Sequence, residues 1–190
     1  MYHGTKVLFD LEAERAAAAL RRQLFEQEES RVAAGVRSEA LHPDDPPIPM
    51  MNGVAKLFVN YDGYNRADQI AGGSKYWGLT FCVGTWMEGG KNMGKDVIGM
   101  IQDFGARGKI FAVHFRNVSS PLPVFHETFQ DDGYLDMYQV MKALRVARCT
   151  GSLIPDHYPG IAGDRNHQLA DAYCIAYMRA LLRRANEEVG

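Results

Sequence analysis

Hydrophobic residues along the chain form short dense runs that alternate with segments of helical spacing. Dense runs bounded by glycine or proline predict strands at residues 77–83, 110–115 and 152–155, and a weaker strand within 36–41 that ends before Pro43. Helix-forming residues, capping signals and, in places, apolar residues at helical spacing predict helices at 11–34, 64–71, 96–104, 137–146 and about 168–186. The glycine-rich segment 84–94 and the proline-containing segment 119–133 are predicted to be loops.

This order of elements predicts a parallel α/β fold. Strands that alternate with helices form βα units whose crossovers are right-handed. The chain holds about four such units, whereas a closed (β/α)₈ barrel takes about 250 residues and eight units. We therefore expect a single domain over residues 1–190, built from about four of the eight βα units of a TIM-type barrel and preceded by the helix at 11–34.

Composition narrows the class of protein. Hydrophobic residues make up 46% and charged residues 23%, which is typical of folded globular chains and not of disordered ones. A formal charge of −2 leaves no basic field for nucleic acid or an anionic membrane surface. The three widely spaced cysteines do not make a disulfide framework, and neither a secretory signal nor an apolar run of the ~20 residues that span a bilayer is visible. A cytoplasmic protein is expected.

Side chains that bind metals stand where the predicted strands end. These residues are His42, Cys82, His114 and Asp156. They are 40, 32 and 42 positions apart, which is about one βα unit each. Because the carboxyl ends of parallel strands meet on one side of the sheet, the four side chains are expected to converge. Two imidazoles, a thiolate and a carboxylate suit Mn²⁺, Fe²⁺ or Zn²⁺ better than Mg²⁺ or Ca²⁺.

Each of these residues also has a simpler interpretation. Cys82 lies between two apolar residues and fits a buried small side chain, and His114 fits a core histidine with its hydrogen bonds satisfied. His42 before a proline could merely end a strand, and Asp156 after a proline could belong to a turn. Four coincidences at the spacing of one βα unit favour the shared site.

Two further residues lie next to these strand ends. Arg116 is two positions past His114 and shares its strand face, where a guanidinium suits a substrate carboxylate; an ion pair with an acid in a loop is equally favoured. His157 follows Asp156 and suits a general acid or base, since an imidazole works near neutral pH.

Six short motifs resemble those of the mannonate dehydratase family over roughly residues 32–182. They are HPDDPP at 42–47, GLTFCVGT at 78–85, VHFRNV at 113–118, FHETF at 125–129, DMYQVM at 136–141 and PDH at 155–157. Members of that family are TIM barrels that dehydrate D-mannonate to 2-keto-3-deoxy-D-gluconate in hexuronate (glucuronate) catabolism, with Mn²⁺ or Fe²⁺. The resemblance implies a metal-dependent hydro-lyase whose partner is a small sugar acid, and it covers only the second half of the family's barrel.

The resemblance also implies roles for individual residues. The implied metal ligands are His42, Cys82, His114 and Asp156. The implied catalytic residues are His157 and Tyr173, and the implied substrate-binding residues are Arg116 and His126. Helical spacing with Tyr177 and Leu181 would otherwise make Tyr173 a packing residue.

Two alternative functions stay open. One is a related metal-dependent TIM-barrel sugar isomerase or epimerase, against which Cys82 and the HPDDPP string favour the lyase. The other is a truncated, catalytically silent derivative that persists as a metal-binding or oligomer-forming domain. A half-barrel exposes two edge strands and one side of its core, so a homo-oligomer is expected in either case.

Overall fold

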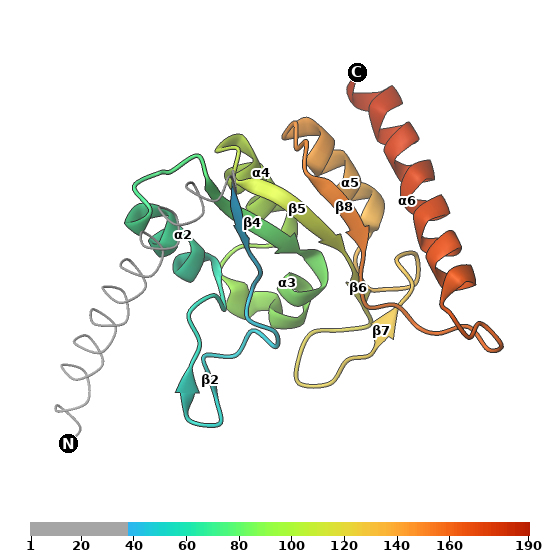
Figure 1. The fold of residues 1–190 in the computed structure, drawn as a ribbon, viewed down its shortest axis with the longest axis horizontal. Helices are drawn as coiled ribbons and strands as arrows, with labels where there is room; N and C mark the ends of the chain where they lie inside the picture. Colours follow the sequence, from blue (N-terminus) through green and yellow to red (C-terminus); the bar gives the residue numbers. More distant parts are fainter. Residues whose placement is uncertain (1–37) are drawn as a thin grey trace.

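The computed structural model describes residues 38–190, and the helix predicted at 11–34 lies outside the described residues. The centre of the fold is a four-stranded sheet in the order β1-β4-β5-β8, in which every neighbouring pair is parallel (Figure 1). The strands are β1 (Glu39–Leu41), β4 (Trp77–Cys82), β5 (Ile110–Phe115) and β8 (Ser152–Pro155). The predicted parallel α/β architecture is therefore confirmed.

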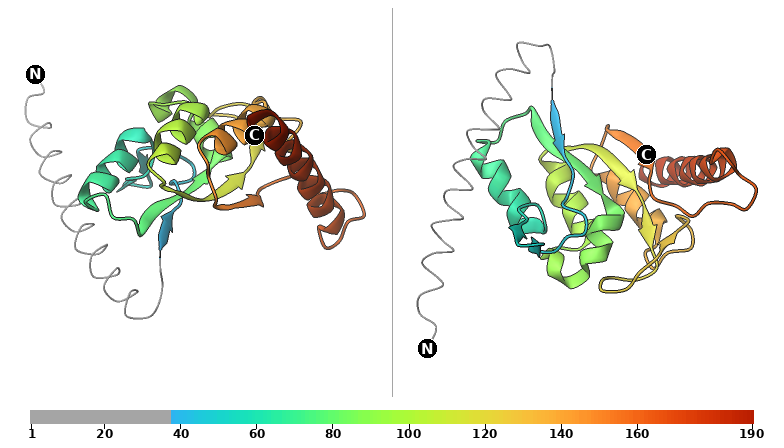
Figure 2. Two further views of the ribbon diagram at one scale, coloured as in Figure 1. Left: turned by 90° about the horizontal axis from the view of Figure 1, so that it is seen from above. Right: turned by 60° about the horizontal axis from the view of Figure 1, so that its bottom comes forward.

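Helices connect the strands, and α4 and α5 pack side by side on one face of the sheet (Figure 2). The helices are α2 (Tyr61–Ile70), α3 (Val83–Gly89), α4 (Val97–Ala106), α5 (Met137–Val146) and α6 (Gln168–Val189). The side chains of Asn60, Asp96 and Asp136 cap α2, α4 and α5 by accepting a hydrogen bond from a backbone N–H of the first turn. Each such cap stabilises its helix by about 1 kcal/mol.

The segment at 84–94, predicted to be a loop, is helical. It forms α3 and the 3₁₀ helix η1 (Gly90–Met93). Every residue of α3 is buried, and the side chains of Trp86 and Met87 belong to the hydrophobic core. Burial of these side chains outweighs the low helix propensity of the glycines, which misled the prediction.

Two small hairpins were also not predicted. Strands β2 (Met50–Met51) and β3 (Val54–Ala55) pair antiparallel, as do β6 (Asn117–Val118) and β7 (Glu127–Thr128). Strand β7 lies inside the segment 119–133 that was predicted to be a loop. Strands of two residues are too short to show any alternation of apolar and polar positions.

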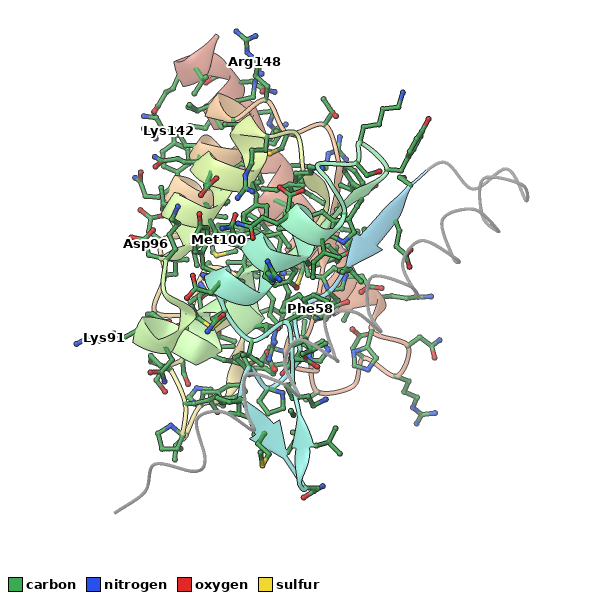
Figure 3. All side chains as sticks on the ribbon, turned by 90° about the vertical axis from the view of Figure 1, so that its left-hand side faces the viewer. Phe58, Lys91, Asp96, Met100, Lys142 and Arg148 are labelled. Carbon is green, nitrogen blue, oxygen red and sulfur yellow. The ribbon has the colours of Figure 1, made fainter. Side chains whose placement is uncertain are left out.

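The core fills the space between the sheet and its helices. Its largest fully buried side chains include Trp86, Tyr64, Phe81, Phe104 and Phe115. Figure 3 shows Met100 on α4, where its side chain is fully buried, while Lys91 extends outward from the surface. Within residues 38–190, β1 and β8 are the two edges of the sheet, and Ile154 on β8 is 43% exposed. No helix in this part of the chain is long and apolar enough to cross a membrane.

Candidate active site

The carboxyl ends of the four parallel strands meet on one side of the molecule, and the predicted ligand residues lie there. His42 follows β1, and Asp156 follows β8. Cys82 is the last residue of β4 and lies directly opposite His114 of β5 in the sheet. This register places the thiol and the imidazole side by side on neighbouring strands.

Three of these side chains bring potential ligand atoms together. His42, Cys82 and His114 each offer one such atom, and the three atoms lie within 4.8 Å of one another. The centroids of the two imidazole rings are 4.9 Å apart. Two nitrogens and one sulfur at this spacing suit a single borderline divalent ion such as Mn²⁺, Fe²⁺ or Zn²⁺.

The contacts of each side chain fit this role. Nδ1 of His42 lies 2.7 Å from the carbonyl oxygen of Pro43, which can only accept, so Nδ1 carries the proton and Nε2 keeps its lone pair. The sulfur of Cys82 accepts hydrogen bonds from the backbone N–H and the hydroxyl of Thr85, at 3.4 and 3.1 Å. In both contacts the sulfur is the acceptor, which is the role it would also have as a metal ligand. Nδ1 of His114 is buried and makes no hydrogen bond to any described residue.

Asp156 lies beside this group without completing it. Its Oδ2 is 3.3 Å from Nδ1 of His114. Asp156 is not among the residues whose ligand atoms all lie within the 4.8 Å span. The carboxylate is therefore next to the three ligands, on the neighbouring strand end.

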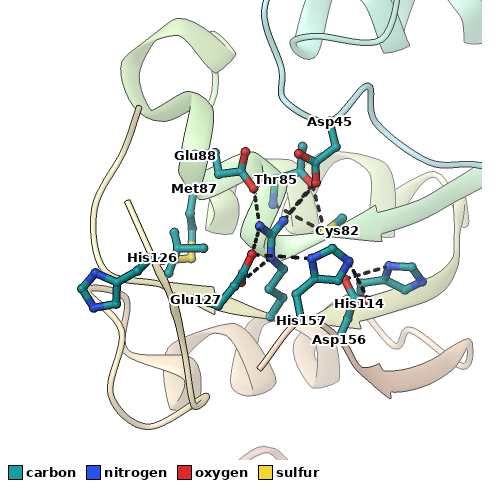
Figure 4. Close-up of polar contacts among 12 residues, drawn as sticks. Asp45, Cys82, Thr85, Met87, Glu88, His114, His126, Glu127, Asp156 and His157 are labelled. Atoms are coloured by element: carbon teal, nitrogen blue, oxygen red, sulfur yellow. Dashed lines mark hydrogen bonds and ion pairs between the residues drawn. The ribbon is translucent and has the colours of Figure 1, made fainter. Parts of the chain in front are cut away.

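Arg116 lies among three carboxylates, and we call these four residues the Arg116 cluster: Arg116, Asp45, Glu88 and Glu127 (Figure 4). Nε and Nη2 of Arg116 donate to the two oxygens of Glu127 at 2.8 and 2.5 Å. Nη2 also lies 2.6 Å from Glu88, and Nη1 lies 3.0 Å from Asp45. The guanidinium is 2% exposed, so these acids occupy the donors that a substrate carboxylate would need. The structure thus shows Arg116 paired with acids, as in the alternative that the sequence left open, although of the three only Asp45 lies in a loop.

Burial and charge shift the pKa values in this cluster. Burial is the largest influence on the pKa of Glu88 and raises it; Arg116 lowers this pKa and Asp45 raises it, and the net result is about 7. Burial alone would lower the pKa of Arg116, but the hydrogen bonds that Arg116 donates to Glu127 and the charge of Glu88 outweigh burial and raise that pKa. Arg116 is therefore a permanent cation, and Glu88 is the acid that holds a proton near neutral pH.

His157 lies at the rim of the site. Its ring is 58% exposed, with Nδ1 3.5 Å from Glu127 and Nε2 3.7 Å from Asp156. Its backbone φ is +44°, in the left-handed region that a histidine rarely adopts. The structure thus brings His157 next to Asp156 and to Glu127 of the Arg116 cluster.

Tyr173 and His126 lie elsewhere. The hydroxyl of Tyr173 on α6 donates to Asp131 at 2.5 Å, and its ring packs edge-on against Phe129. The hydrogen bond to Asp131 raises the pKa of Tyr173 to about 12. The side chain of His126 is exposed and points away from the cluster in Figure 4. Neither residue joins the ligand group in the described part of the chain.

Sequence reasoning missed the acids around Arg116. Glu88 was the easiest to find, because it is the one charged residue of an otherwise uncharged run at 81–90. A lone acid in such a run predicts a buried charge that needs a cation. Glu127 and Asp45 carry no comparable signal, because β7 and the loop after β1 bring them to Arg116 from 11 and 71 positions away.

Comparison with known proteins gives one consistent family. The family model described as D-mannonate dehydratase (UxuA) matches residues 22–185. The mannonate dehydratase of Streptococcus suis (strain 05ZYH33) is 35% identical over 134 residues, which cover 70% of this chain and 35% of that protein. The mannonate dehydratase of Thermotoga maritima is 34% identical over 129 residues, or 66% of this chain and 34% of that protein. The chain therefore spans about a third of the length of these relatives.

Comparison with solved structures points to the same family. The crystal structure of mannonate dehydratase from Streptococcus suis serotype 2 matches with a TM-score of 0.72 and 29% identity, covering 80% of this chain and 44% of that one. A D-tagatose 3-epimerase-like protein matches with a TM-score of 0.61 and 16% identity, covering 95% of this chain and 60% of that one, which supports the fold alone. Because the family model spans most of the sequence, this chain belongs to the D-mannonate dehydratase family.

Proposed function

We propose that this chain forms part of a metal-dependent dehydratase that removes water from D-mannonate to give 2-keto-3-deoxy-D-gluconate, in hexuronate catabolism in the cytoplasm. The observation that carries the proposal is the convergence of His42, Cys82 and His114 at the ends of three neighbouring parallel strands. Family membership supports the reaction class, and the donor set is one that such a reaction uses.

We assign Mn²⁺ or Fe²⁺ to this group. His42, Cys82 and His114 would hold the ion, and Asp156 is the carboxylate next to them that would serve as a fourth ligand. When bound, the ion would stabilise the negative charge that develops next to the substrate carboxylate. The carboxylate of Asp156, 3.3 Å from Nδ1 of His114, supports this assignment because it places a fourth potential ligand beside the other three.

The chain's own residues would move the protons. The dehydration removes a proton from the carbon next to the carboxylate and expels the neighbouring hydroxyl as water, and the resulting enol becomes the keto acid. We assign one of these proton transfers to the exposed imidazole of His157 and the other to Tyr173. Tyr173 must first leave Asp131, because that hydrogen bond holds its proton.

We further propose that a homo-oligomer completes the barrel. Strands β1 and β8 are the two edges of the sheet in the described residues. An edge strand offers unpaired backbone groups, and exposed apolar side chains such as Ile154 favour coverage. Light scattering of the purified chain should give a mass above that of one 21.2 kDa chain.

Turnover tests the function directly. The purified chain with added Mn²⁺ is incubated with D-mannonate, and the 2-keto acid is followed over time. We expect product from the wild-type chain and none from His114→Asn, which removes one ligand from β5. Absence of product from a folded, metal-loaded oligomer would contradict the proposal.

The second candidate is a catalytically silent member of the family. The hydrogen bond between Tyr173 and Asp131 favours it, because the phenol is held by a loop and not directed at the ligand group. A silent member would still bind metal through His42, Cys82 and His114. Metal binding without turnover would identify this candidate.

A further inference from the structure

We propose that Glu127 is a positioning residue that fixes the imidazole of His157, and that Arg116 holds Glu127 in place for this purpose. The inference rests on the proposed function, in which His157 transfers a proton. It gives the Arg116 cluster a role in the reaction without any contact to substrate.

The first step is the rigidity of the carboxylate. Arg116 donates hydrogen bonds to both oxygens of Glu127, at 2.8 and 2.5 Å, and this bidentate geometry strongly restricts the carboxylate. The guanidinium also forms ion pairs with Glu88 through Nη2 and with Asp45 through Nη1. Its aliphatic stem packs against Gly84, where a Cβ would lie 2.4 Å from Cγ and Cδ of Arg116. The guanidinium has little room to move, and neither does the carboxylate that it holds.

The backbone beneath Glu127 is fixed as well. Glu127 lies on β7 opposite Val118 of β6, so the hairpin sets its position relative to Arg116. Asn117 anchors the hairpin, because its side-chain amide donates to the carbonyl oxygens of Gln130 and Leu135 at 2.8 and 3.0 Å. The β6–β7 hairpin, which follows β5, thus places the carboxylate of Glu127 at the rim of the site.

The last step is the histidine. Nδ1 of His157 faces Oε1 of Glu127 at 3.5 Å, slightly longer than a hydrogen bond, as is common before substrate binds. The ring is 58% exposed, so little packing holds it, and the left-handed φ of His157 sets its direction at some conformational cost. A carboxylate that accepts from Nδ1–H fixes the tautomer and leaves the lone pair on Nε2 for proton transfer. Asp156 lies farther away, 3.7 Å from Nε2.

Three variants test the inference in the full-length chain. Glu127→Gln removes the charge at constant shape, Glu127→Asp keeps the charge one methylene farther back, and Asp132→Asn removes an exposed carboxylate from the same loop as a matched control. Two quantities are measured for each. One is the tautomer of His157 by ¹H–¹⁵N correlation on ¹⁵N-histidine protein, assigned with His157→Asn. The other is the pair kcat and KM for D-mannonate with Mn²⁺.

We expect the wild-type chain and Asp132→Asn to show the Nδ1–H form of His157, and Glu127→Gln to lose it. We expect kcat of Glu127→Gln to fall about 10- to 100-fold with KM changed less than about 3-fold, and Glu127→Asp to recover part of that loss. An unchanged tautomer and unchanged kcat in a folded Glu127→Gln protein would overturn the inference. If the wild-type chain has no turnover, the proposed function fails, while the tautomer still decides whether Glu127 orients His157.

Discussion

Replacing Glu88 by glutamine should remove a pH-dependent loss of stability from the wild-type chain. The Glu88 side chain is fully buried, and burial raises its pKa from 4.5 to about 7. At a pH between these two pKa values, Glu88 keeps its proton in the folded protein but has released it in the unfolded chain. The stability that this proton contributes is present below the unfolded pKa and is lost as the pH rises through about 7.

The magnitude follows from the two pKa values. One pKa unit corresponds to about 1.4 kcal/mol, so the full difference corresponds to about 3 kcal/mol. Over an accessible range from about pH 5 to about pH 8.5, most of this, about 2.5 kcal/mol, should be lost. Glutamine does not titrate, so Glu88→Gln should lack this component although it also loses the ion pair with Arg116.

Urea unfolding at a series of pH values measures the effect. The quantity of interest is the difference in unfolding free energy between the wild-type chain and Glu88→Gln at each pH, because other titrating groups cancel in it. Asp132→Asn, an exposed acid, serves as the control and should follow the wild-type chain. Parallel pH profiles for wild type and Glu88→Gln would refute the reasoning, because they would show that Glu88 has the same pKa in both states.

Three further changes have defined outcomes. Gly84→Ala should lower the unfolding free energy by about 1–3 kcal/mol in urea titrations, because the new Cβ would meet the immobile stem of Arg116 at 2.4 Å; full stability would mean that the stem can move. Asp131→Asn should lower the pKa of Tyr173 from about 12 toward 10, read as tyrosinate absorbance against Tyr173→Phe; an unchanged value would contradict the role of Asp131. Cys82→Ser should abolish the sulfur-to-metal charge-transfer band in Co²⁺ titrations, and a retained band would exclude Cys82 as a ligand.

Local patterns sufficed for the elements that rest on dense apolar runs. Strand β5 and helix α5 have the predicted bounds, because each carries its own burial signal and begins or ends at a clear glycine or capping residue. Helix α3 could not be predicted, since its glycines disfavour a helix and only the surrounding core makes the segment helical. The sequence of a segment does not reveal which distant residues pack against that segment in the folded protein.

The site residues likewise divide into those that local sequence predicts and those that depend on contacts between distant segments. The rule that parallel strands end on one side was enough to bring His42, Cys82 and His114 together, because it needs only strand positions. The partners of Arg116 depend on the hairpin and loops, which return Glu127 and Asp45 from distant positions. Strand alternation predicted the face of Arg116 but could not reveal that acids already surround it.

The Arg116 cluster has a consequence for how this chain can change in evolution. Loss of Arg116 would leave three carboxylates close together, one of them fully buried, and loss of Glu127 would leave Nε of the buried guanidinium without its acceptor. An unpaired buried charge costs several kcal/mol, so single replacements within the cluster pass through a destabilised intermediate. We expect Arg116, Glu88 and Glu127 to be retained or replaced together among relatives, as one inherited unit.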